Sequence, residues 1–441
     1  MRRSLLLALC AWALVGISCG AINPTAHLEY APSTLPVGPL WVGTWLPAGM
    51  NRFQFDEADQ GQLAALGLNS VQWLQRYEDE RGTAEAQLMR FASARGWQVP
   101  AYYEPTDLTP YDKLHNWATR TEAPAPDSLR IVAEGVYAQW DAIPAFAGYL
   151  VGHEDYRKEQ YPALAQVVRT LGQVDSARPV YSVGRLSDYE NAHAFFDALF
   201  DSGASGNVFQ QEHYVFRGNV PESGGAFQRR IGLLIDGYDG VARGLERRSG
   251  RWHAIVQVQS EVRGTKVYYR KPTAGEIRLQ AGLALSRGAS GIVYFLYSSG
   301  VEELRDSKGV VERRVYEGLV DLDGRPTPSY AAVQAINADL LALSEPLQDL
   351  HFHGALSSRF LLENPQVKEL DGDVEVGLFG DGQRVTHLLV VNRWGHAAQR
   401  VGLRLDGNAV VDAVTGVRLD WANGRVELEL AAGEFRLLRI E

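Results

Sequence analysis

Residues 253–297 read HAIVQVQSEVRGTKVYYRKPTAGEIRLQAGLALSRGASGIVYFLY, and this stretch decides the fold class. It opens with a short apolar run, His253–Gln259, which is typical of a buried β-strand. A helix signal follows, because Thr273 and Glu276 form a capping-box pattern. A second apolar run, Gly291–Tyr297, closes the stretch. A helix between two such runs predicts a crossover between parallel neighbouring strands.

The same alternation runs through the chain before this stretch. Its clearest helix is a stripe of apolar residues at helical spacing between Leu164 and Val174. The eight predicted strands are Leu40–Leu46, Ser70–Gln75, Gln98–Tyr103, Ala147–Gly152, Pro179–Val183, Asn207–Glu212, His253–Gln259 and Gly291–Tyr297. Eight alternations over about 300 residues predict an α/β fold of the (β/α)8 (TIM) barrel type. An open doubly wound sheet is the structural competitor, but the first strand is not followed by a glycine-rich phosphate turn.

The sequence changes character after a helical pattern at Tyr330–Leu343, which is the expected eighth outer helix. From about residue 350 onward, short segments alternate apolar and polar residues, separated by turn dipeptides such as Asp406-Gly407 and Asn423-Gly424. This pattern predicts a small antiparallel β-sandwich. We therefore expect the barrel at 39–345 and an accessory sandwich at 350–441.

The N-terminus has the pattern of an export signal. Met1-Arg2-Arg3 is basic, Leu5–Ile17 is apolar, and small residues surround Cys19. We expect a leader at 1–21 and a proline-containing tether at 22–38. Both cysteines, Cys10 and Cys19, lie in the leader, so the mature chain would carry no disulfide. Cys19 stands where a bacterial lipoprotein carries its lipid. The sequence thus predicts an exported protein, either a lipoprotein of the outer membrane or cell surface, or a secreted or periplasmic protein.

Composition limits the partners. The chain has 441 residues and a net charge of −10, with acidic and basic residues interspersed, so nucleic acid is not an expected partner. Contact with a membrane is expected only through a lipid on Cys19. No Walker loop, dinucleotide fingerprint or zinc-ligand spacing accompanies the barrel pattern, so neither a cofactor nor a metal is expected. The oligomeric state is left open.

Carboxylates mark the ends of four predicted strands. Glu104 follows the third strand, Glu154 the fourth and Glu261 the seventh, while Glu212 ends the sixth. The active sites of such barrels lie at the carboxyl ends of the strands, so we expect these side chains on one face. Glycosidic cleavage needs two carboxyl groups. One protonates the departing oxygen, and the other attacks the anomeric carbon or activates water. The four glutamates therefore point to this chemistry.

A family resemblance points the same way. The stretch Gly148–Asp155, GYLVGHED, resembles the fourth-strand motif of the glycoside hydrolase clan that includes β-galactosidases and cellulases. Residues 252–295 are similar to the last two barrel units of family 42-like β-galactosidases, and the β-domain with Val390–Arg393 is similar to their appended domains. The resemblance implies a glycoside hydrolase that cleaves a poly- or oligosaccharide, β-linked and with retention. It also implies that Glu154 is the acid/base.

The chain departs from that pattern at several positions. His153 stands where the clan has Asn, and Asp155 where many relatives have Pro. Gln257 and Gln259 occupy positions where some relatives would have the nucleophile. Glu261 has the same strand parity as both glutamines, so we expect it to act as the nucleophile if the strand runs on.

Other functions therefore stay open. The two glutamines would also suit a carbohydrate-binding barrel without catalysis. Alternatively, Glu154 would work with Glu212 or with an acetamido group of the substrate. The expected substrate-binding residues are Glu212, His153, His213, Tyr214, Gln257, Gln259, Glu104 and Tyr297. Of Tyr294, Phe295 and Tyr297, at least one is expected to pack in the core, because strand residues alternate in direction.

Overall fold

The structure, a computed structural model, describes residues 32–46, 55–73, 81–101, 118, 121–122, 124–151, 157–186, 189–201, 206–218, 224–305, 309, 311–359 and 364–441. Eight parallel strands form one sheet in the order β2-β1-β10-β7-β6-β5-β4-β3. They are β1 (Trp41–Leu46), β2 (Gln72–Trp73), β3 (Val99–Ala101), β4 (Phe146–Leu150), β5 (Val180–Gly184), β6 (Val208–Glu212), β7 (Arg251–Gln257) and β10 (Gly291–Phe295). All eight predicted strand positions are confirmed. Six of the strands are shorter than the predicted apolar runs, while β5 and β7 have the same length as theirs, shifted by one or two residues.

Main-chain hydrogen bonds close this sheet into a barrel. Beside the two edge strands β2 and β3, Val71 N donates to Gln98 O at 3.2 Å, and Gln98 N donates to Asn69 O at 3.0 Å. A parallel bridge joins Ser70 to Gln98. The predicted (β/α)8 barrel is therefore confirmed, and the open doubly wound sheet is excluded.

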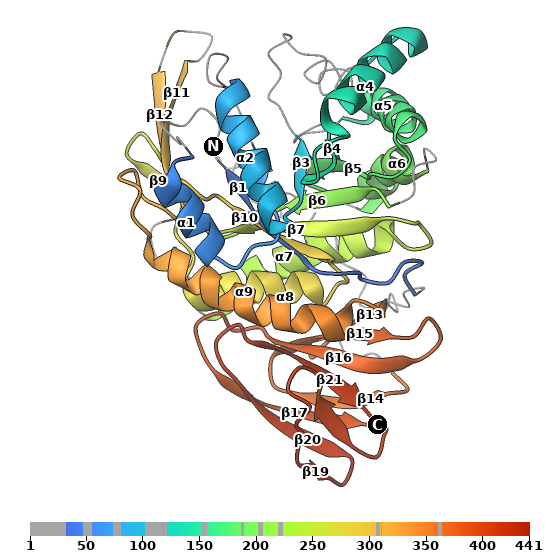
Figure 1. Cartoon of the computed structure of the whole chain (residues 1–441). Coiled ribbons are helices and arrows are strands. Elements are labelled where there is room, and N and C mark those ends of the chain that lie inside the picture. The colour runs from blue at the N-terminus through green and yellow to red at the C-terminus, as the bar shows by residue number, and fades with distance from the viewer. Residues whose placement is uncertain are drawn as a thin grey trace, which may run out of the picture.

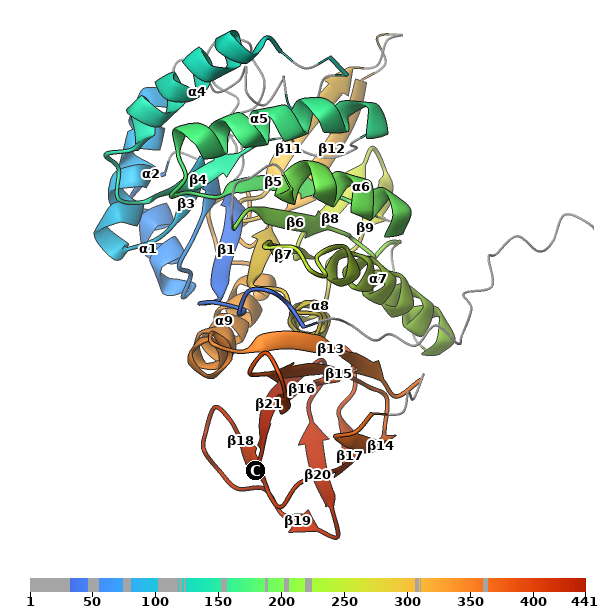
Figure 2. The same ribbon diagram turned by 90° about the vertical axis from the view of Figure 1, so that its right-hand side faces the viewer.

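Helices cover the outside of the barrel (Figures 1 and 2). They are α1 (Glu57–Ala65), α2 (Arg81–Arg95), α4 (Pro126–Trp140), α5 (Tyr161–Val174), α6 (Tyr189–Phe200), α7 (Gly224–Gly244), α8 (Ala274–Leu285) and α9 (Pro328–Leu347). The capping box of α8 forms as predicted, since Glu276 N donates to Thr273 Oγ1 at 3.2 Å and Thr273 N donates to Glu276 Oε2 at 2.8 Å. None of the described helices is both long and apolar enough to cross a membrane.

The interior of the barrel is filled by side chains from alternate strand residues. Trp41 of β1 lies 5.6 Å from Tyr181 of β5 and 5.3 Å from His253 of β7, measured between ring centroids. Burial, and to a lesser degree Arg251, lowers the pKa of His253 to about 3. The barrel is thus a packed core with a neutral imidazole in it, and it has no open pore.

A second, smaller sheet lies at the carboxyl end of the barrel. It consists of β8 (Ser260–Arg263), β9 (Lys266–Tyr269), β11 (Gly300–Arg305) and β12 (Val311–Glu317), in the antiparallel order β11-β12-β8-β9. We call it the rim sheet, because its strands come from the segments that follow β7 and β10. It stands away from the sandwich (Figure 1). The condition that strand seven runs on to Glu261 is not met, since β7 ends at Gln257 and Glu261 belongs to the rim sheet.

The C-terminal part of the chain is the predicted antiparallel β-sandwich. One sheet has the order β13-β15-β16-β21-β18 and the other β14-β17-β20-β19. The strands are β13 (His351–Ser357), β14 (Val367–Asp371), β15 (Val374–Gly380), β16 (Val385–Asn392), β17 (Gln399–Leu405), β18 (Val410–Asp412), β19 (Trp421–Ala422), β20 (Arg425–Leu430) and β21 (Phe435–Ile440). Their inward residues, such as Val376, Val390 and Leu428, form a separate apolar core.

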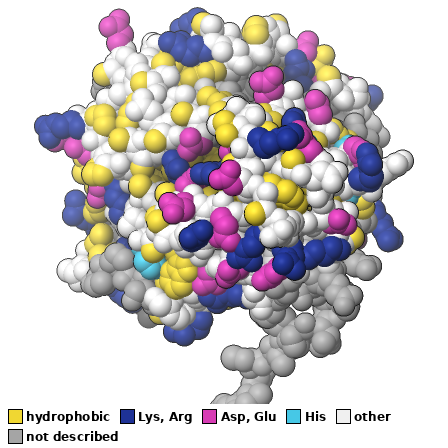
Figure 3. Space-filling view, turned by 90° about the horizontal axis from the view of Figure 1, so that it is seen from below, with side chains coloured by type: hydrophobic (Ala, Val, Ile, Leu, Met, Phe, Trp, Pro, Cys, Tyr) yellow, Lys and Arg dark blue, Asp and Glu magenta, His cyan; other side chains and the backbone are white. Residues whose placement is uncertain are grey.

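The sandwich lies against α8 and α9 (Figures 1 and 2). Gly282 of α8 permits this approach, because a Cβ at that position would lie 2.9 Å from both Val391 Cγ1 and Phe435 Cδ1. Seen from below, the sandwich end of the molecule carries interspersed acidic and basic side chains (Figure 3). One such exposed pair joins Arg400 of β17 to Glu427 of β20 at 3.1 Å. Because positive and negative side chains alternate there, the electrostatic field over that face stays small.

Glu375 of β15 links the sandwich to the barrel. Its side chain is fully buried and forms ion pairs with Arg287, just after α8, and with Arg393, just after β16. Arg287 Nε also contacts Asp239 Oδ1 of α7 at 3.1 Å, and Arg393 Nε donates to Gln228 Oε1 of α7 at 3.3 Å. A single buried carboxylate thus holds two guanidinium groups between the two parts of the chain.

Candidate active site

Glu212 is the last residue of β6, at the carboxyl end of the barrel, and is half-buried. Its neighbours Gln211 and His213 face the surrounding helix α7. A Cβ built on Gly237 of that helix would lie 3.4 Å from Gln211 Nε2 and 2.8 Å from His213 Nδ1. Because successive strand side chains point to opposite faces, Glu212 faces the barrel mouth.

His213 is placed behind β6, on the side of α7. Burial, and to a lesser degree the nearby Arg185 and Arg217, lowers the pKa of His213 to about 4. The imidazole is therefore neutral at pH 7. The expected role of His213 in binding sugar hydroxyls stays a prediction, but its direction separates it from Glu212.

Three aromatic side chains meet beside Glu212. Tyr214 and Phe295 are stacked, with ring centroids 5.7 Å apart and an interplanar angle of 25°. Tyr269 of the rim sheet meets Tyr214 edge-on, at 5.6 Å and 84°. We call Tyr214, Tyr269 and Phe295 the aromatic wall. It supplies an apolar surface next to a carboxylate, the usual composition of a small-molecule site.

Glu261 lies on β8 of the rim sheet. It is registered opposite Tyr269 of β9 and Tyr316 of β12, so these three side chains share one face of that sheet. Tyr316 packs with Leu296, which follows β10. That face is therefore turned towards the end of the barrel. Glu261 is 3% exposed, and its Oε1 accepts a hydrogen bond from Arg263 Nε at 2.5 Å.

Gln257 has its side chain occupied by main-chain groups. Its Oε1 accepts from Phe216 N at 3.1 Å, and its Nε2 donates to Phe216 O at 3.1 Å and to Arg270 O at 3.0 Å. These bonds join the end of β7 to the segments after β6 and β9. Gln257 therefore holds these segments together, with both amide N–H groups and one of the two lone pairs of Oε1 in use. Its expected role in substrate binding stays a prediction.

Gln259 differs from Gln257. Its side chain is 1% exposed, and its Oε1 has no hydrogen-bond partner among the described residues. A buried amide oxygen without a donor costs free energy, about 1–3 kcal/mol. Gln259 thus fits the expected part of a substrate-binding residue, which stays a prediction.

Tyr297 packs away from the mouth. It is fully buried, and its hydroxyl lies 3.3 Å from Gln62 Oε1 and 3.5 Å from Asp59 O, both on α1. Tyr294 is likewise buried and donates to Asn337 Oδ1 of α9 at 2.8 Å. Of the three aromatic residues expected at this strand, Phe295 is the one in the aromatic wall. The expectation that at least one of them packs in the core is met.

Glu104, His153 and Glu154 lie outside the described residues. Their predicted roles rest on the sequence. Among the described residues, no group of three or more His, Cys, Asp or Glu side chains is gathered as metal ligands would be.

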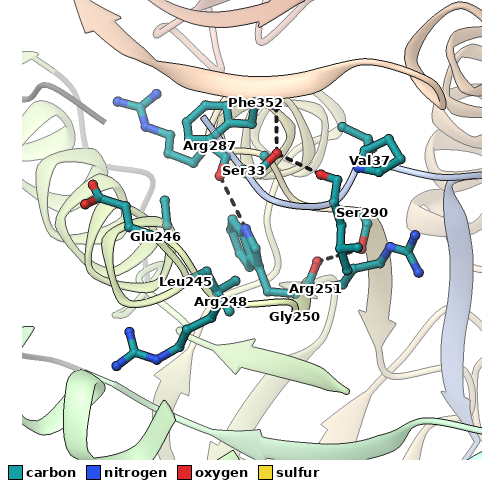
Figure 4. Close-up of a pocket in the computed structure, with 15 residues that line it drawn as sticks. Ser33, Val37, Leu245, Glu246, Arg248, Gly250, Arg251, Arg287, Ser290 and Phe352 are labelled. Atoms are coloured by element: carbon teal, nitrogen blue, oxygen red, sulfur yellow. Dashed lines mark hydrogen bonds between the residues drawn. The ribbon is translucent and has the colours of Figure 1, made fainter. Parts of the chain in front are cut away.

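Another hollow lies at the opposite end of the barrel (Figure 4). It is lined by Arg251 and Trp252 at the start of β7, Ser290 before β10, Ser33 and Phe352. Trp252 Nε1 donates to Arg287 O at 3.3 Å across it. In these barrels the amino end serves stability and the carboxyl end serves catalysis. We therefore place the candidate site at the mouth with Glu212.

The rim sheet was not predicted from the sequence, and Tyr269 and Arg217 were not among the expected site residues. A signal was present. Gly264-Thr265 separates two short alternating runs, 260–263 and 266–269, and Gly264 has a φ of +58°. A two-residue loop with glycine between such runs is typical of a β-hairpin. This hairpin carries Glu261 and Tyr269 to the mouth.

The chain matches no family model and no curated protein. Its structure is similar to that of a β-galactosidase from Bacillus circulans sp. alkalophilus, with a TM-score of 0.56 and 8% identity, over 93% of this chain and 100% of that one. It is similar to an α-amylase from Geobacillus thermoleovorans, with a TM-score of 0.50 and 11% identity, over 91% and 98% of the two chains. Amy13B from Eubacterium rectale gives a TM-score of 0.50 and 10% identity, over 93% and 97%. The chain thus has the TIM-barrel fold of glycoside hydrolases, and these matches do not single out the family 42-like β-galactosidases.

Proposed function

We propose that this protein is a glycoside hydrolase that cleaves a β-linked poly- or oligosaccharide with retention of configuration. One observation carries the proposal. A half-buried carboxylate, Glu212, faces the mouth of the barrel beside an aromatic wall. The barrel has the fold of glycoside hydrolases. Carboxylate and flat apolar surface together suit a sugar ring, whose hydroxyls are polar and whose faces are less so.

Glu154 is the proposed acid/base. In the sequence it comes just after β4, as Glu212 comes at the end of β6. Glu154 would protonate the departing glycosidic oxygen and then take a proton from the attacking water. The sequence motif that contains it supports this role.

Glu212 is the proposed second carboxylate. It is more accessible than Glu261, which is 3% exposed and held by Arg263 at 2.5 Å. A nucleophile must reach the anomeric carbon of the substrate, so the more accessible carboxylate suits that role better. We therefore assign Glu212 the nucleophilic role and Glu261 the role of fixing Arg263 in the rim sheet. The nucleophile that the sequence suggested, Glu261, becomes the alternative.

The protein is proposed to act outside the cytoplasm. The leader at residues 1–21, with Cys19 as a lipid attachment site, supports this location. A polymeric saccharide is then the accessible substrate.

A carbohydrate-binding barrel without catalysis is the second candidate. It is favoured by the end of β7, where some members of the resembled family would have the catalytic glutamate. This chain has Gln257 there, whose amide is bound to main-chain groups. Such a protein would bind saccharides through the aromatic wall and release no product.

The anomeric form of the first product tests the proposal. The purified protein is incubated with a panel of β-linked saccharides, and the newly formed reducing end is followed by ¹H NMR. We expect the β-anomer to appear first and to mutarotate later, because two displacements restore the configuration. A first-formed α-anomer from the same β-linkage would show inversion, and Glu212 would then be a general base. No new reducing end from any saccharide would favour the binding protein.

A further inference from the structure

Arg217 is fixed at the mouth of the site by two main-chain anchors. The preceding residue, Phe216, is bound at its N and O atoms by the Gln257 side chain, at 3.1 Å each. Arg217 itself forms an antiparallel bridge with Tyr269 of β9. The segment after β6 is therefore tied to β7 and to the rim sheet, directly beside the aromatic wall.

The guanidinium group of Arg217 rests on tyrosine rings. Its Cζ atom lies 5.4 Å from the ring centroids of both Tyr268 and Tyr269. Tyr269 in turn contacts Tyr214. An arginine held in this way loses less freedom when it binds a ligand than a free surface arginine does.

Arg217 has no carboxylate partner among the described residues. Its neighbours in this region do have one: Arg263 pairs with Glu261 at 2.5 Å, and Arg270 pairs with Glu276 at 2.6 Å. Among the described residues, no carboxylate therefore balances the charge that Arg217 places beside Tyr269 of the aromatic wall. The positive charge therefore points to an anion that comes from outside.

We propose that the saccharide recognised at this site is anionic, and that Arg217 binds its acidic group. The acidic group is a carboxylate of a uronic acid or a sulfate ester, since the planar guanidinium fork matches two oxygens of either one. This inference rests on the proposed function for the location of the sugar, and it adds the class of substrate.

Binding to matched polysaccharides tests the inference. Wild-type protein is applied to immobilised polyuronic acids and sulfated polysaccharides, each paired with its carboxyl-reduced or desulfated derivative. We expect at least about 10-fold tighter binding to the acidic member of a pair, and weaker binding as the salt concentration rises. For each pair, the affinity for the acidic member is divided by the affinity for its neutral derivative. The pair with the larger ratio shows whether the recognised group is a carboxylate or a sulfate.

Three variants test whether Arg217 is responsible for the preference for acidic saccharides. Arg217→Gln should lose most of that preference, while Arg217→Lys should keep part of it, because it retains the charge without the fork. Arg169→Gln is the control, because Arg169 is exposed on α5 and has no ion pair among the described residues. The inference is overturned if the wild type binds neutral and acidic members equally, if it binds no acidic member, or if Arg217→Gln keeps the wild-type preference.

The outcome separates this inference from the proposed function. If acidic saccharides bind in a way that depends on Arg217 but no product is released, the inference of an anionic ligand is supported and the proposed hydrolase activity is refuted. If the protein cleaves neutral saccharides and Arg217→Gln cleaves them at the same rate, the proposed hydrolase activity is supported and the inference of an anionic substrate is refuted.

Discussion

Replacing Glu154 with glutamine is expected to lower turnover of natural saccharides by about 100-fold or more, the effect of losing a positioned acid. The departing sugar oxygen is a poor leaving group and needs a proton, which glutamine cannot supply. Substrates with an activated aryl leaving group should suffer much less, because they leave without protonation. Initial rates on an aryl glycoside and on the matching disaccharide measure the two effects.

A nearby glutamate provides the control for this change. Glu159, on the short 3₁₀ helix before α5, is exposed, and Glu159→Gln should leave both rates unchanged. The variants are isosteric with the wild type, so a lower melting temperature is not expected for either. Equal losses on the two substrates, or full activity of Glu154→Gln, would remove Glu154 from the role of acid/base.

Replacing Glu375 with alanine is expected to lower the free energy of unfolding by about 3–5 kcal/mol, the cost of breaking a buried ion pair. The change leaves Arg287 and Arg393 buried without their shared carboxylate. It also removes the acceptor of Ser357 Oγ, which donates to Glu375 Oε1 at 2.8 Å. Urea denaturation followed by tryptophan fluorescence gives the free energy and shows whether the barrel and the sandwich unfold together.

An exposed pair in the same sandwich is the comparison. Glu427 lies on the surface between Arg400 and Arg425, and solvent screens such pairs, so Glu427→Ala should change stability little. A small effect of Glu375→Ala, similar to that of Glu427→Ala, would mean that the buried cluster does not hold the two parts of the chain together.

The barrel and the sandwich could be predicted from the sequence because both depend on periodic apolar patterns. The apolar run that begins at Gly291 and the capping box at Thr273 are local signals, and both are found where they were expected. The rim sheet was missed because Ser260–Arg263 follows β7 almost directly. An apolar run shows where a strand is, but not where the chain leaves one sheet and joins another.

For the candidate site, the sequence predicted only which residues lie at the ends of the strands. The position of Glu212 follows from the end of β6, and strand parity gives its direction. The partners of Gln257 and Tyr297 could not be predicted, because they come from segments far away in the sequence: Phe216 for Gln257, and α1 for Tyr297. Arg217 has no sequence signal of its own. Its importance depends on the rings that support it and on the lack of a carboxylate partner among the described residues.

Release of reducing ends by the wild type and by Glu212→Gln tests the central claim most directly. Both proteins, with Glu345→Gln on the exposed face of α9 as a control, are assayed on the saccharide that the wild type cleaves best. We predict that the wild type and Glu345→Gln release reducing ends at the same rate, and that Glu212→Gln is slower by about 10²–10⁴-fold with unchanged folding. Glu261→Gln, assayed alongside, should keep most of the activity. If the wild type releases none from any saccharide, or if Glu212→Gln is as fast as the wild type, the account is contradicted.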